Sequence, residues 1–305
     1  VSTLPNDIHD SVPDSDVVIE EFNVPESPIM GQDHIKVLGE HNCLNPEDGV
    51  RITGIRGFQV MRNTAAVIEQ SLINYAIKFA MKRGFELVSV PDLVRAEAID
   101  NWSGFVPRHE RVDPVYRVDG DLALTGTAEI PLLAMHAGMT NAVEKRLVAY
   151  GHCFRREAGQ TGSNYRGLYR LHQFRKVELF AVCDPCDGEK MYEDICRVQL
   201  DLIKSLGFYG RVLQVCSASL GASAYLKRDI ELWFPGLNRF GEVTSASWCT
   251  DYQARRAGTK NGNGEYMHTV NATAMAPSRI IQCIAEHGMQ IPDVLKNEMD
   301  LYNPC

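Results

Sequence analysis

The sequence predicts an α+β fold in which a mainly antiparallel sheet is flanked by helices. Segments with strand-like alternation outnumber the helical ones, and most of them follow one another along the chain, which favours antiparallel pairing. The helical stretches carry their apolar residues on one face, as helices that pack on a sheet do. With 305 residues, of which 45% are hydrophobic, the chain can bury a sizeable core.

The first part of the chain predicts a lead-in, a long helix and a strand. Residues 1–50 are rich in Asp, Glu, Pro and Asn, so we expect an irregular or loosely strand-forming linker, with the folded domain over residues 51–305. In residues 63–83 the apolar side chains fall on one helical face, and a glycine supplies the stop. Residues 85–90 then predict a strand that ends before a proline.

The rest of the chain predicts a further strand, a second helix, and then several strands that lead to a last helix. Residues 122–129 alternate and close on a carboxylate, which predicts a strand that ends in a solvated Glu129. The second helix is expected over residues 190–206, with one apolar face. The last helix is expected to open at Pro277 and to end near Gly288. The strands between the two helices are expected at residues 211–215, 229–234, 239–247 and 266–273.

A basic segment, residues 153–178, predicts a long hairpin that binds a polyanion. Two apolar-polar stretches are joined there by the small and polar residues 159–164. Residues 145–178 contain eight Lys or Arg but only two carboxylates, in a chain whose net charge is −8. Such a local excess of positive charge favours an anionic ligand.

Composition argues against several classes of protein. No run of about 18 apolar residues is present, so we expect no membrane span, and an acidic chain is not expected to coat DNA. The nine cysteines are scattered, and their odd count favours reduced thiols in an intracellular compartment. Cys183 and Cys186 form a close pair, but without a second ligand pair a structural role is favoured over a zinc or redox site.

Three groups of residues point to nucleotide chemistry, although the sequence contains no glycine-rich phosphate loop. Arg155 and Arg156 begin the hairpin, and a guanidinium suits bidentate contact with phosphate or carboxylate. Glu242 lies on a predicted strand, where it can hold a magnesium ion that bridges phosphates. Arg279 lies in the first turn of the last helix, where amide groups favour anions. Taken singly, each group has a structural alternative: paired surface arginines, a salt-bridged glutamate and an arginine at a helix end.

Taken together, several motifs resemble those of the class II seryl-tRNA synthetases. Their order and spacing agree along nearly the whole chain, and two of them are most similar to the mitochondrial branch. The motifs are Thr127-Ala128-Glu129, Phe154-Arg155-x-Glu157, the stretch from Arg166 to Glu178, residues 240–247, and the stretch from His268 to Arg279. The resemblance implies the class II synthetase catalytic fold for residues 51–305, in the mitochondrial matrix or, alternatively, in the cytoplasm.

The resemblance also implies an activity and its partners. A member of this family joins L-serine to ATP as seryl-adenylate, releases pyrophosphate and passes the seryl group to tRNA(Ser), with Mg²⁺ as cofactor. The family dimerises through its first long helix and the following strand, here residues 63–91, so we expect a homodimer. No nucleophilic side chain is expected, because catalysis of this kind depends on positioning and electrostatics.

The resemblance assigns roles to individual residues. Arg155 would grip the α-phosphate and the serine carboxylate, and Arg279 would cover the adenine or reach the γ-phosphate. Glu242 with Ser245 would hold magnesium and phosphate. The ATP site would further include Arg156, Glu157 at the adenine amino group, Phe174 stacked on the ring, Val243 and Thr244. Serine would be bound by Thr127 and Glu129 at its ammonium group, by Glu178 and Thr273 at its hydroxyl, and also by Ala128 and Asn271.

The chain departs from the family pattern in three places. No heptad pattern precedes residue 50, so we expect the helical arm that grips the tRNA to be absent from this chain. Trp248 stands where the family usually has Asn, near the expected serine pocket, and is either harmless packing or the mark of a paralogue with changed activity. Ser278 replaces the more usual Gly or Pro. Two other functions therefore stay open: a catalytically silent synthetase-like binding protein, and a ligase that loads an amino acid onto a carrier protein.

Overall fold

An eight-stranded sheet forms the centre of the structure, a computed structural model that describes residues 4–105, 113–156 and 167–302. Its strand order is β1-β8-β9-β10-β11-β7-β6-β2. Neighbouring strands are antiparallel except β2 and β6, so the prediction of a mainly antiparallel sheet is confirmed. The strands are β1 (Val17–Phe22), β2 (Glu86–Leu87), β6 (Lys145–Phe154), β7 (Gln173–Cys183), β8 (Gly210–Gln214), β9 (Leu226–Phe234), β10 (Arg239–Thr250) and β11 (His268–Met275).

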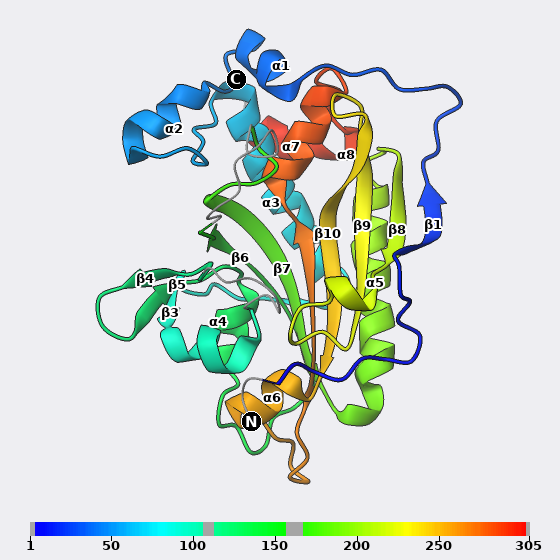
Figure 1. Cartoon of the computed structure of the whole chain (residues 1–305). Helices are drawn as coiled ribbons and strands as arrows, with labels where there is room; N and C mark the ends of the chain where they lie inside the picture. The colour runs from blue at the N-terminus through cyan, green and yellow to red at the C-terminus, as the bar shows by residue number, and fades with distance from the viewer. Residues whose placement is uncertain (1–3, 106–112, 157–166, 303–305) are drawn as a thin grey trace.

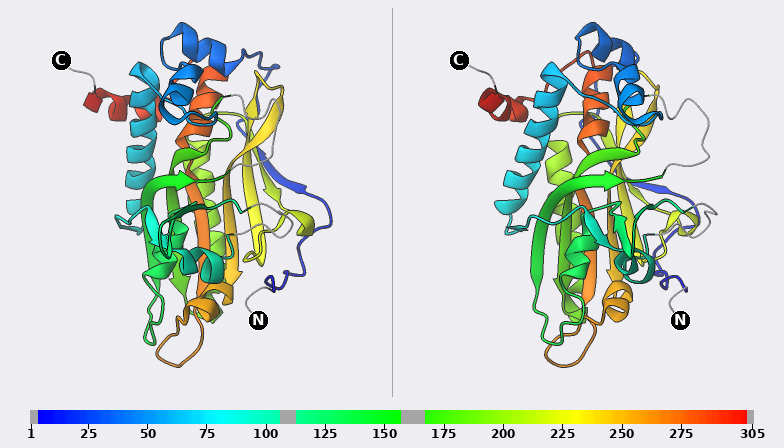
Figure 2. Two further views of the ribbon diagram at one scale, coloured as in Figure 1. Left: turned by 60° about the vertical axis from the view of Figure 1, so that its left-hand side comes forward. Right: turned by 90° about the vertical axis from the view of Figure 1, so that its left-hand side faces the viewer.

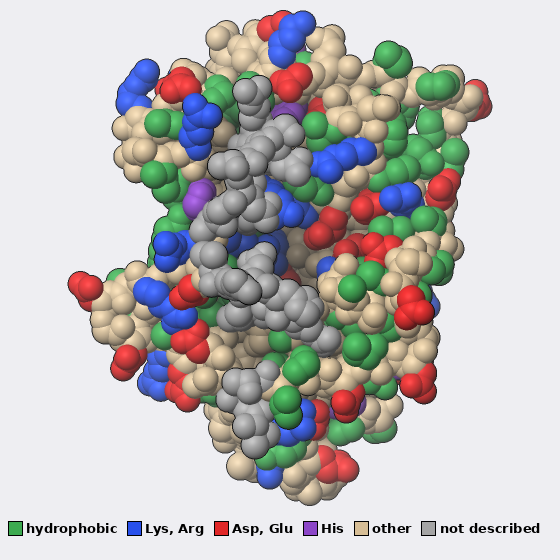
Figure 3. Space-filling view, in the orientation of Figure 1, with side chains coloured by type: hydrophobic (Ala, Val, Ile, Leu, Met, Phe, Trp, Pro, Cys, Tyr) green, Lys and Arg blue, Asp and Glu red, His purple; other side chains and the backbone are tan. Residues whose placement is uncertain are grey.

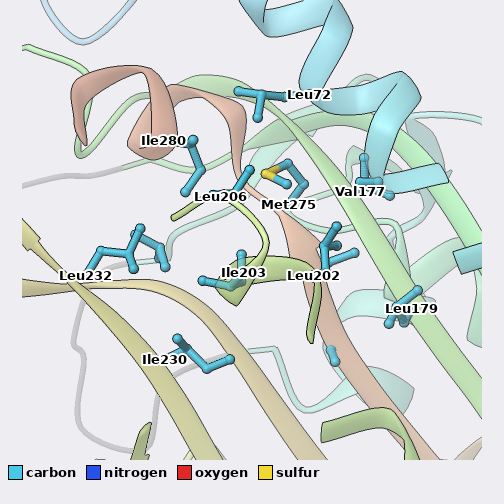
Figure 4. Packing of buried hydrophobic residues seen from close by; sticks show 14 of the residues in the cluster. Leu72, Val177, Leu179, Leu202, Ile203, Leu206, Ile230, Leu232, Met275 and Ile280 are labelled. Carbon is cyan, nitrogen blue, oxygen red and sulfur yellow. The ribbon is translucent and has the colours of Figure 1, made fainter. Parts of the chain in front are cut away.

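A layer of helices covers one face of this sheet. It consists of α3 (Asn63–Met81), α5 (Gly188–Lys204) and α7 (Pro277–Glu286), and α8 (Asp293–Met299) packs on α3. Figure 1 shows α3 and α5 behind the large sheet. Leu202 and Ile203 of α5 are buried among strand residues such as Leu179 and Ile230 (Figure 4). Burial of each such side chain stabilises the fold by about 1.5–3 kcal/mol. The large buried cluster between the sheet and this layer therefore supplies most of the stabilisation.

A smaller antiparallel sheet lies on the other side of the large one. Its order is β3-β5-β4, and α4 and α6 pack beside it. Phe180 and Val182 of β7 pack in the cluster of α4, whereas Leu179 and Ala181 pack in the cluster of the helical layer, because successive side chains of a strand point to opposite faces. Figure 2 shows α3 and the small sheet on opposite sides of β6 and β7. The elements are β3 (Leu93–Arg95), the π-helix η1 (Ala98–Ser103), β4 (Tyr116–Val118), β5 (Leu122–Leu124), α4 (Glu129–Ala134) and α6 (Tyr252–Ala257).

The predicted hairpin is the pair β6 and β7. Their register runs from Lys145 opposite Val182 to Phe154 opposite Gln173, so the antiparallel pairing is confirmed. The predicted loop 159–164 lies outside the described residues. The second strand starts at Gln173 rather than at Arg166, because residues 167–172 form bends that pack against the start of the domain, where the Gly57 carbonyl accepts from the His172 amide at 2.8 Å.

Both long helices and the later strands form where the sequence predicts them, but three elements differ. The strand expected at 85–90 is reduced to β2, and the strand expected at 122–129 ends at Leu124. Glu129 therefore opens α4 instead of closing a strand, and it is half-buried rather than solvated. The helix that begins at Pro277 is not the last, since α8 follows it.

The lead-in also contains regular structure. β1 pairs with β8 at the edge of the sheet. In α1 (His34–Glu40) the Asp33 side chain caps the first amides, those of Ile35 and Lys36. In α2 (Pro46–Thr53) Asn45 caps the start and Gly54, in the left-handed region, ends the helix. These caps explain two short helices that lack the long apolar stripe of α3.

Within the described residues, no helix is both long and apolar enough to cross a membrane.

Candidate active site

The floor of the site is the face of the large sheet that looks away from the helical layer. Thr273 of β11 pairs in register with Glu178 of β7, and Asn271 pairs with Ser247 of β10. Partners in register point to the same side of a sheet, so these polar side chains from three strands share one face. Val177, a neighbour of Glu178 in sequence, is buried in the core on the opposite face. The period of two therefore separates site from core residue by residue.

A β-bulge in β10 brings two further site residues to one wall. The pairing of β10 with β9 shifts in register between Glu242 and Thr244. Residues three apart in a regular strand point to opposite faces, but the extra residue of a bulge restores the same side. Glu242 and Ser245 consequently both line one cavity. A carboxylate and a hydroxyl so placed are oxygen ligands of the kind that Mg²⁺ prefers.

Two adjoining cavities open on this face, with volumes of about 230 and 510 Å³. The smaller one, here called the first cavity, has walls from the hairpin, β10 and α7. The larger one, the second cavity, lies between the end of η1, the start of α4 and the segment that follows β8. In Figure 3, blue basic and red acidic side chains meet around a hollow at the middle of this face. The first cavity is lined by Arg155, Tyr169, Arg170, Leu171, Phe174, Lys176, Glu242, Val243, Ser245, Thr273, Ala276, Ser278 and Arg279.

Arg155 lies at the junction, because it lines both cavities. Its guanidinium carbon lies 5.5 Å from the centre of the Phe105 ring and 5.3 Å from that of the Phe174 ring. The Gly126 carbonyl accepts a hydrogen bond from Arg155 Nε at 3.3 Å. The two rings and this bond fix the guanidinium in place, where it can contact an anion in either cavity.

Arg279 and Glu242 form the polar end of the first cavity. Arg279 Nη1 donates to the Glu242 carbonyl at 2.8 Å and to Glu242 Oε1 at 3.2 Å, and Nε donates to the Tyr169 carbonyl at 3.3 Å. Burial opposes the ionisation of Glu242, but the positive charges of Arg279 and Lys227 outweigh it and lower the pKa of this carboxyl. Burial raises the pKa of the neighbouring Asp229. Glu242 is therefore the ionised carboxylate of this wall.

Glu129 forms the acidic wall of the second cavity. Its Oε1 accepts from Gln253 Nε2 at 2.6 Å and from Asn271 Nδ2 at 3.0 Å. Burial, and next the charge of Glu178, raise the pKa of Glu129 to about 7, against the opposing effects of Gln253, Lys176 and Arg155. A carboxyl poised in this way gains strongly from a cationic ligand.

Glu178 is buried behind the first cavity and pairs with a lysine. Lys176 Nζ lies 2.5 Å from Glu178 Oε2, and both side chains are less than a tenth exposed. The pair is almost dehydrated, so each charge depends on the other. Lys176 carries the positive charge into the cavity wall, and Glu178 stabilises it from behind.

Not every predicted site residue reaches a cavity wall. Arg156 is exposed, and Thr244 is buried without lining either cavity. Thr127 is buried beside Glu129, whose amide donates to Thr127 Oγ1 at 3.3 Å, and Ala128 packs in the core of α4. Glu157 lies outside the described residues.

Trp248 points away from the second cavity, so of the two alternatives that the sequence left open, the structure supports packing. Ser247 lines the second cavity, and the next side chain necessarily points to the other face of β10. There the indole is 8% exposed and packs against Tyr192 of α5 and edge-on to Tyr225. Its Nε1 donates to His268 Nδ1 at 3.4 Å. Trp248 is a core residue of the helical layer.

Several wall residues were missed by the sequence interpretation. Lys176 could have been found, since it alternates with Phe174 and Glu178 on one strand face. Gln253, which contacts Glu129, lies on the short helix α6, and Phe105, which contacts Arg155, lies in the irregular stretch after η1, so neither carries a periodic signal. Among the described residues, no group of three or more His, Cys, Asp or Glu side chains is arranged to hold a metal ion.

Comparisons with known proteins identify what this site is similar to. The profile of the tRNA synthetase class II core domain (G, H, P, S and T) matches residues 115–288. The serine–tRNA ligase of Treponema denticola is 36% identical over 97% of this chain and 73% of its own length. The mitochondrial serine–tRNA ligase of Saccharomyces cerevisiae is 36% identical over 98% of this chain and 71% of its own. The seryl-tRNA synthetase of Pyrococcus horikoshii, solved with ATP, superposes with a TM-score of 0.88 at 31% identity, covering 98% of this chain and 75% of that one.

Proposed function

Because this chain belongs to the class II seryl-tRNA synthetases, we propose that its first cavity binds ATP and its second cavity binds L-serine for the formation of seryl-adenylate. The enzyme is a serine–tRNA ligase, and the seryl group then passes to tRNA(Ser). The observation that carries the assignment of the cavities is the position of Arg155, which lines both. One guanidinium can therefore hold the α-phosphate and the serine carboxylate together.

In the activation step, a serine carboxylate oxygen attacks the α-phosphorus and the bond to pyrophosphate breaks. Negative charge builds on the phosphoryl oxygens during this step, and a fixed guanidinium stabilises it without reorganisation. Arg155 is held by two rings and the Gly126 carbonyl, which supports this role. Phe174 offers a ring face in the same cavity for the adenine.

The remaining ATP contacts are proposed at the polar end of the first cavity. Arg279 would contact the adenine ring or the γ-phosphate, since it lies in the first turn of α7 with its guanidinium over the Tyr169 ring. Glu242 and Ser245 would share a Mg²⁺ ion with phosphate oxygens and water, because a low carboxyl pKa and an oxygen-only pair suit this ion. When bound, Mg²⁺ neutralises phosphate charge.

The serine contacts are proposed at the acidic wall. Glu129, oriented by Gln253 and Asn271, would bind the ammonium group, with Thr127 fixing the turn beneath it. The register pair Thr273 and Glu178 would contact the hydroxyl from the side of the first cavity, whose wall includes Thr273 and behind which Glu178 is buried. A site that leaves buried polar groups unpaired rejects alanine by far more than the size difference alone.

Serine-dependent ATP–pyrophosphate exchange tests the proposal. We expect exchange with serine but not with alanine or threonine, and its loss in Arg155→Ala. Exchange by the Arg155→Ala protein, or none by a folded wild-type protein, would contradict the assignment. Charging of tRNA(Ser) is then measured with the same protein.

Two further properties are proposed on the family assignment. A homodimer would form through α3 and the edge strand β2, where Met81 and Leu87 are exposed. Analytical ultracentrifugation measures the mass of the assembly, and Leu87→Lys is expected to dissociate the dimer.

Residence in mitochondria is supported by the yeast mitochondrial relative. Imaging of the tagged full-length protein tests it, and a purely cytoplasmic signal would contradict it.

A further inference from the structure

A buried histidine lies outside both cavities, and we infer that His34 is a positioning residue for ATP. It holds the segment 167–171, of which Tyr169, Arg170 and Leu171 line the first cavity. The inference rests on the proposed function of that cavity. It adds a residue of the lead-in to a site that is otherwise built from the sheet and α7.

The contact with this segment is close and buried. His34 is 3% exposed, and its Nε2 accepts from the amide of Leu168, itself fully buried, at 3.4 Å. Gly167 lies directly against the ring, since a Cβ atom there would be 1.7 Å from Nε2. Gly167 also has a φ of +93°, which favours glycine. The backbone at 167–168 is thus shaped around the imidazole.

The other ring nitrogen faces a second buried group. His34 Nδ1 lies 3.3 Å from Glu286 Oε1 of α7. The Glu286 carboxylate is anchored in turn, because Gly236 and Leu237 amides donate to Oε2 and Gln282 donates to Oε1. Since Nε2 accepts from Leu168, the proton of a neutral ring resides on Nδ1, facing the carboxylate. No hydrogen bond joins Nδ1 to the carboxylate, but the negative charge of Glu286 at this distance favours the tautomer that can hold Leu168.

The residues after Leu168 carry this constraint into the cavity. The Tyr169 hydroxyl donates to the Glu242 carbonyl at 3.1 Å, and the Tyr169 carbonyl accepts from Arg279. Both partners are proposed ATP contacts. A shift of Leu168 would move Tyr169 and loosen Arg279 without touching the serine cavity. The effect of His34 should accordingly fall on ATP and spare serine.

The test is ATP and serine titration in the pyrophosphate exchange assay, with ATP affinity also measured by calorimetry. For His34→Ala we expect KM for ATP to rise about tenfold, from the loss of a buried acceptor, with KM for serine unchanged. His34→Gln, whose amide oxygen can accept from Leu168, should recover most of the loss. Glu286→Gln should also raise KM for ATP, because its amide group donates toward Nδ1 and favours the wrong tautomer.

The control is His41→Ala, an exposed histidine at the end of the same helix that contacts the Val37 carbonyl. It should leave both KM values unchanged. An unchanged KM for ATP in His34→Ala, with or without a lower unfolding midpoint, would overturn the inference and leave His34 a structural residue. Absence of exchange in the wild-type protein would instead overturn the proposed function, so the two failures are distinct.

Discussion

Asn271 and Glu129, 142 residues apart in the chain, are joined by a hydrogen bond of 3.0 Å across the wall of the second cavity. One comes from β11 and the other from the first position of α4. The bond therefore links the large sheet to the small sheet's side of the molecule at the point where the serine ammonium group is proposed to bind. The bond also occupies Oε1 of Glu129, so that Oε2 is the carboxylate oxygen left to contact a cationic ligand.

The pH dependence of serine use should report Glu129. Its raised pKa of about 7 means that the carboxyl is neutral below this pH and cannot pair with an ammonium group. We expect kcat/KM for serine to rise from pH about 6 to about 8, and Glu129→Gln to lower it and abolish the rise. Initial-rate pH profiles of both proteins measure this; a rise that persists in the variant would assign it to another group.

The same shift has a consequence for stability. A carboxyl whose folded-state pKa lies above its unfolded value binds more protons when folded, so its ionisation costs folding free energy as the pH rises. Glu129→Gln should therefore gain stability relative to wild type between pH about 5 and about 8. Denaturant unfolding at several pH values checks the trend, and a gain confined to acid pH would contradict it.

Arg279→Lys should weaken ATP binding while the fold persists. Lysine keeps the charge but cannot donate at once to the Glu242 and Tyr169 oxygens. We expect about a tenfold rise in KM for ATP, on the scale of one lost charged hydrogen bond. Arg255→Lys, at an exposed ion pair with Asp251, serves as the matched control and should behave as wild type.

Trp248 should matter for stability and not for serine. Replacing a buried indole on the α5 face by the family's usual Asn removes core packing and buries an amide, so Trp248→Asn should cost about 3–5 kcal/mol of unfolding free energy. Trp248→Phe should cost less, because it keeps an aromatic ring against Tyr192. KM for serine should stay unchanged in Trp248→Phe. A changed KM would show that Trp248 contributes to serine binding.

The Lys176 and Glu178 pair should show strong coupling. Either Lys176→Met or Glu178→Gln leaves a buried partner without its counter-charge, which costs about 3–5 kcal/mol for an ion left unpaired. The double variant should be more stable than the sum of the single losses predicts. Urea unfolding of the four proteins measures the coupling, and strict additivity would show that the pair is hydrated.

Periodic patterns made the large sheet and its helices predictable from the sequence. The apolar stripe of α3 and the alternation along β7 and β11 each encode both the element and the face that it buries. The hairpin position of Arg155 followed from β6 and β7. Short elements were a different matter, because α1, α2, α6 and α8 are held by caps and tertiary contacts and carry no long stripe.

Details of the site could not be predicted where a strand ends or shifts its register within an otherwise regular alternation of side chains. Residues 122–129 alternate like one strand, yet the strand stops at Leu124 and Glu129 starts a helix, which changes the neighbours of its carboxyl. The role of Trp248 stayed open in the sequence, because the bulge between Glu242 and Thr244 shifts the alternation that decides which face of β10 the indole points to. His34 has no motif of its own, since its partners Leu168 and Glu286 are distant in sequence.

The pairing of β1 with β8 gives the lead-in a protective role. A bare β8 would offer a row of unpaired amides and carbonyls as a template for another chain. β1 covers that row, and it is itself poorly suited to extension, because a bulge interrupts it between Val18 and Glu20 and two consecutive glutamates follow. The strand Val17–Phe22 thus protects the edge of the sheet from aggregation, while the face of the sheet that carries the two cavities stays open to substrates.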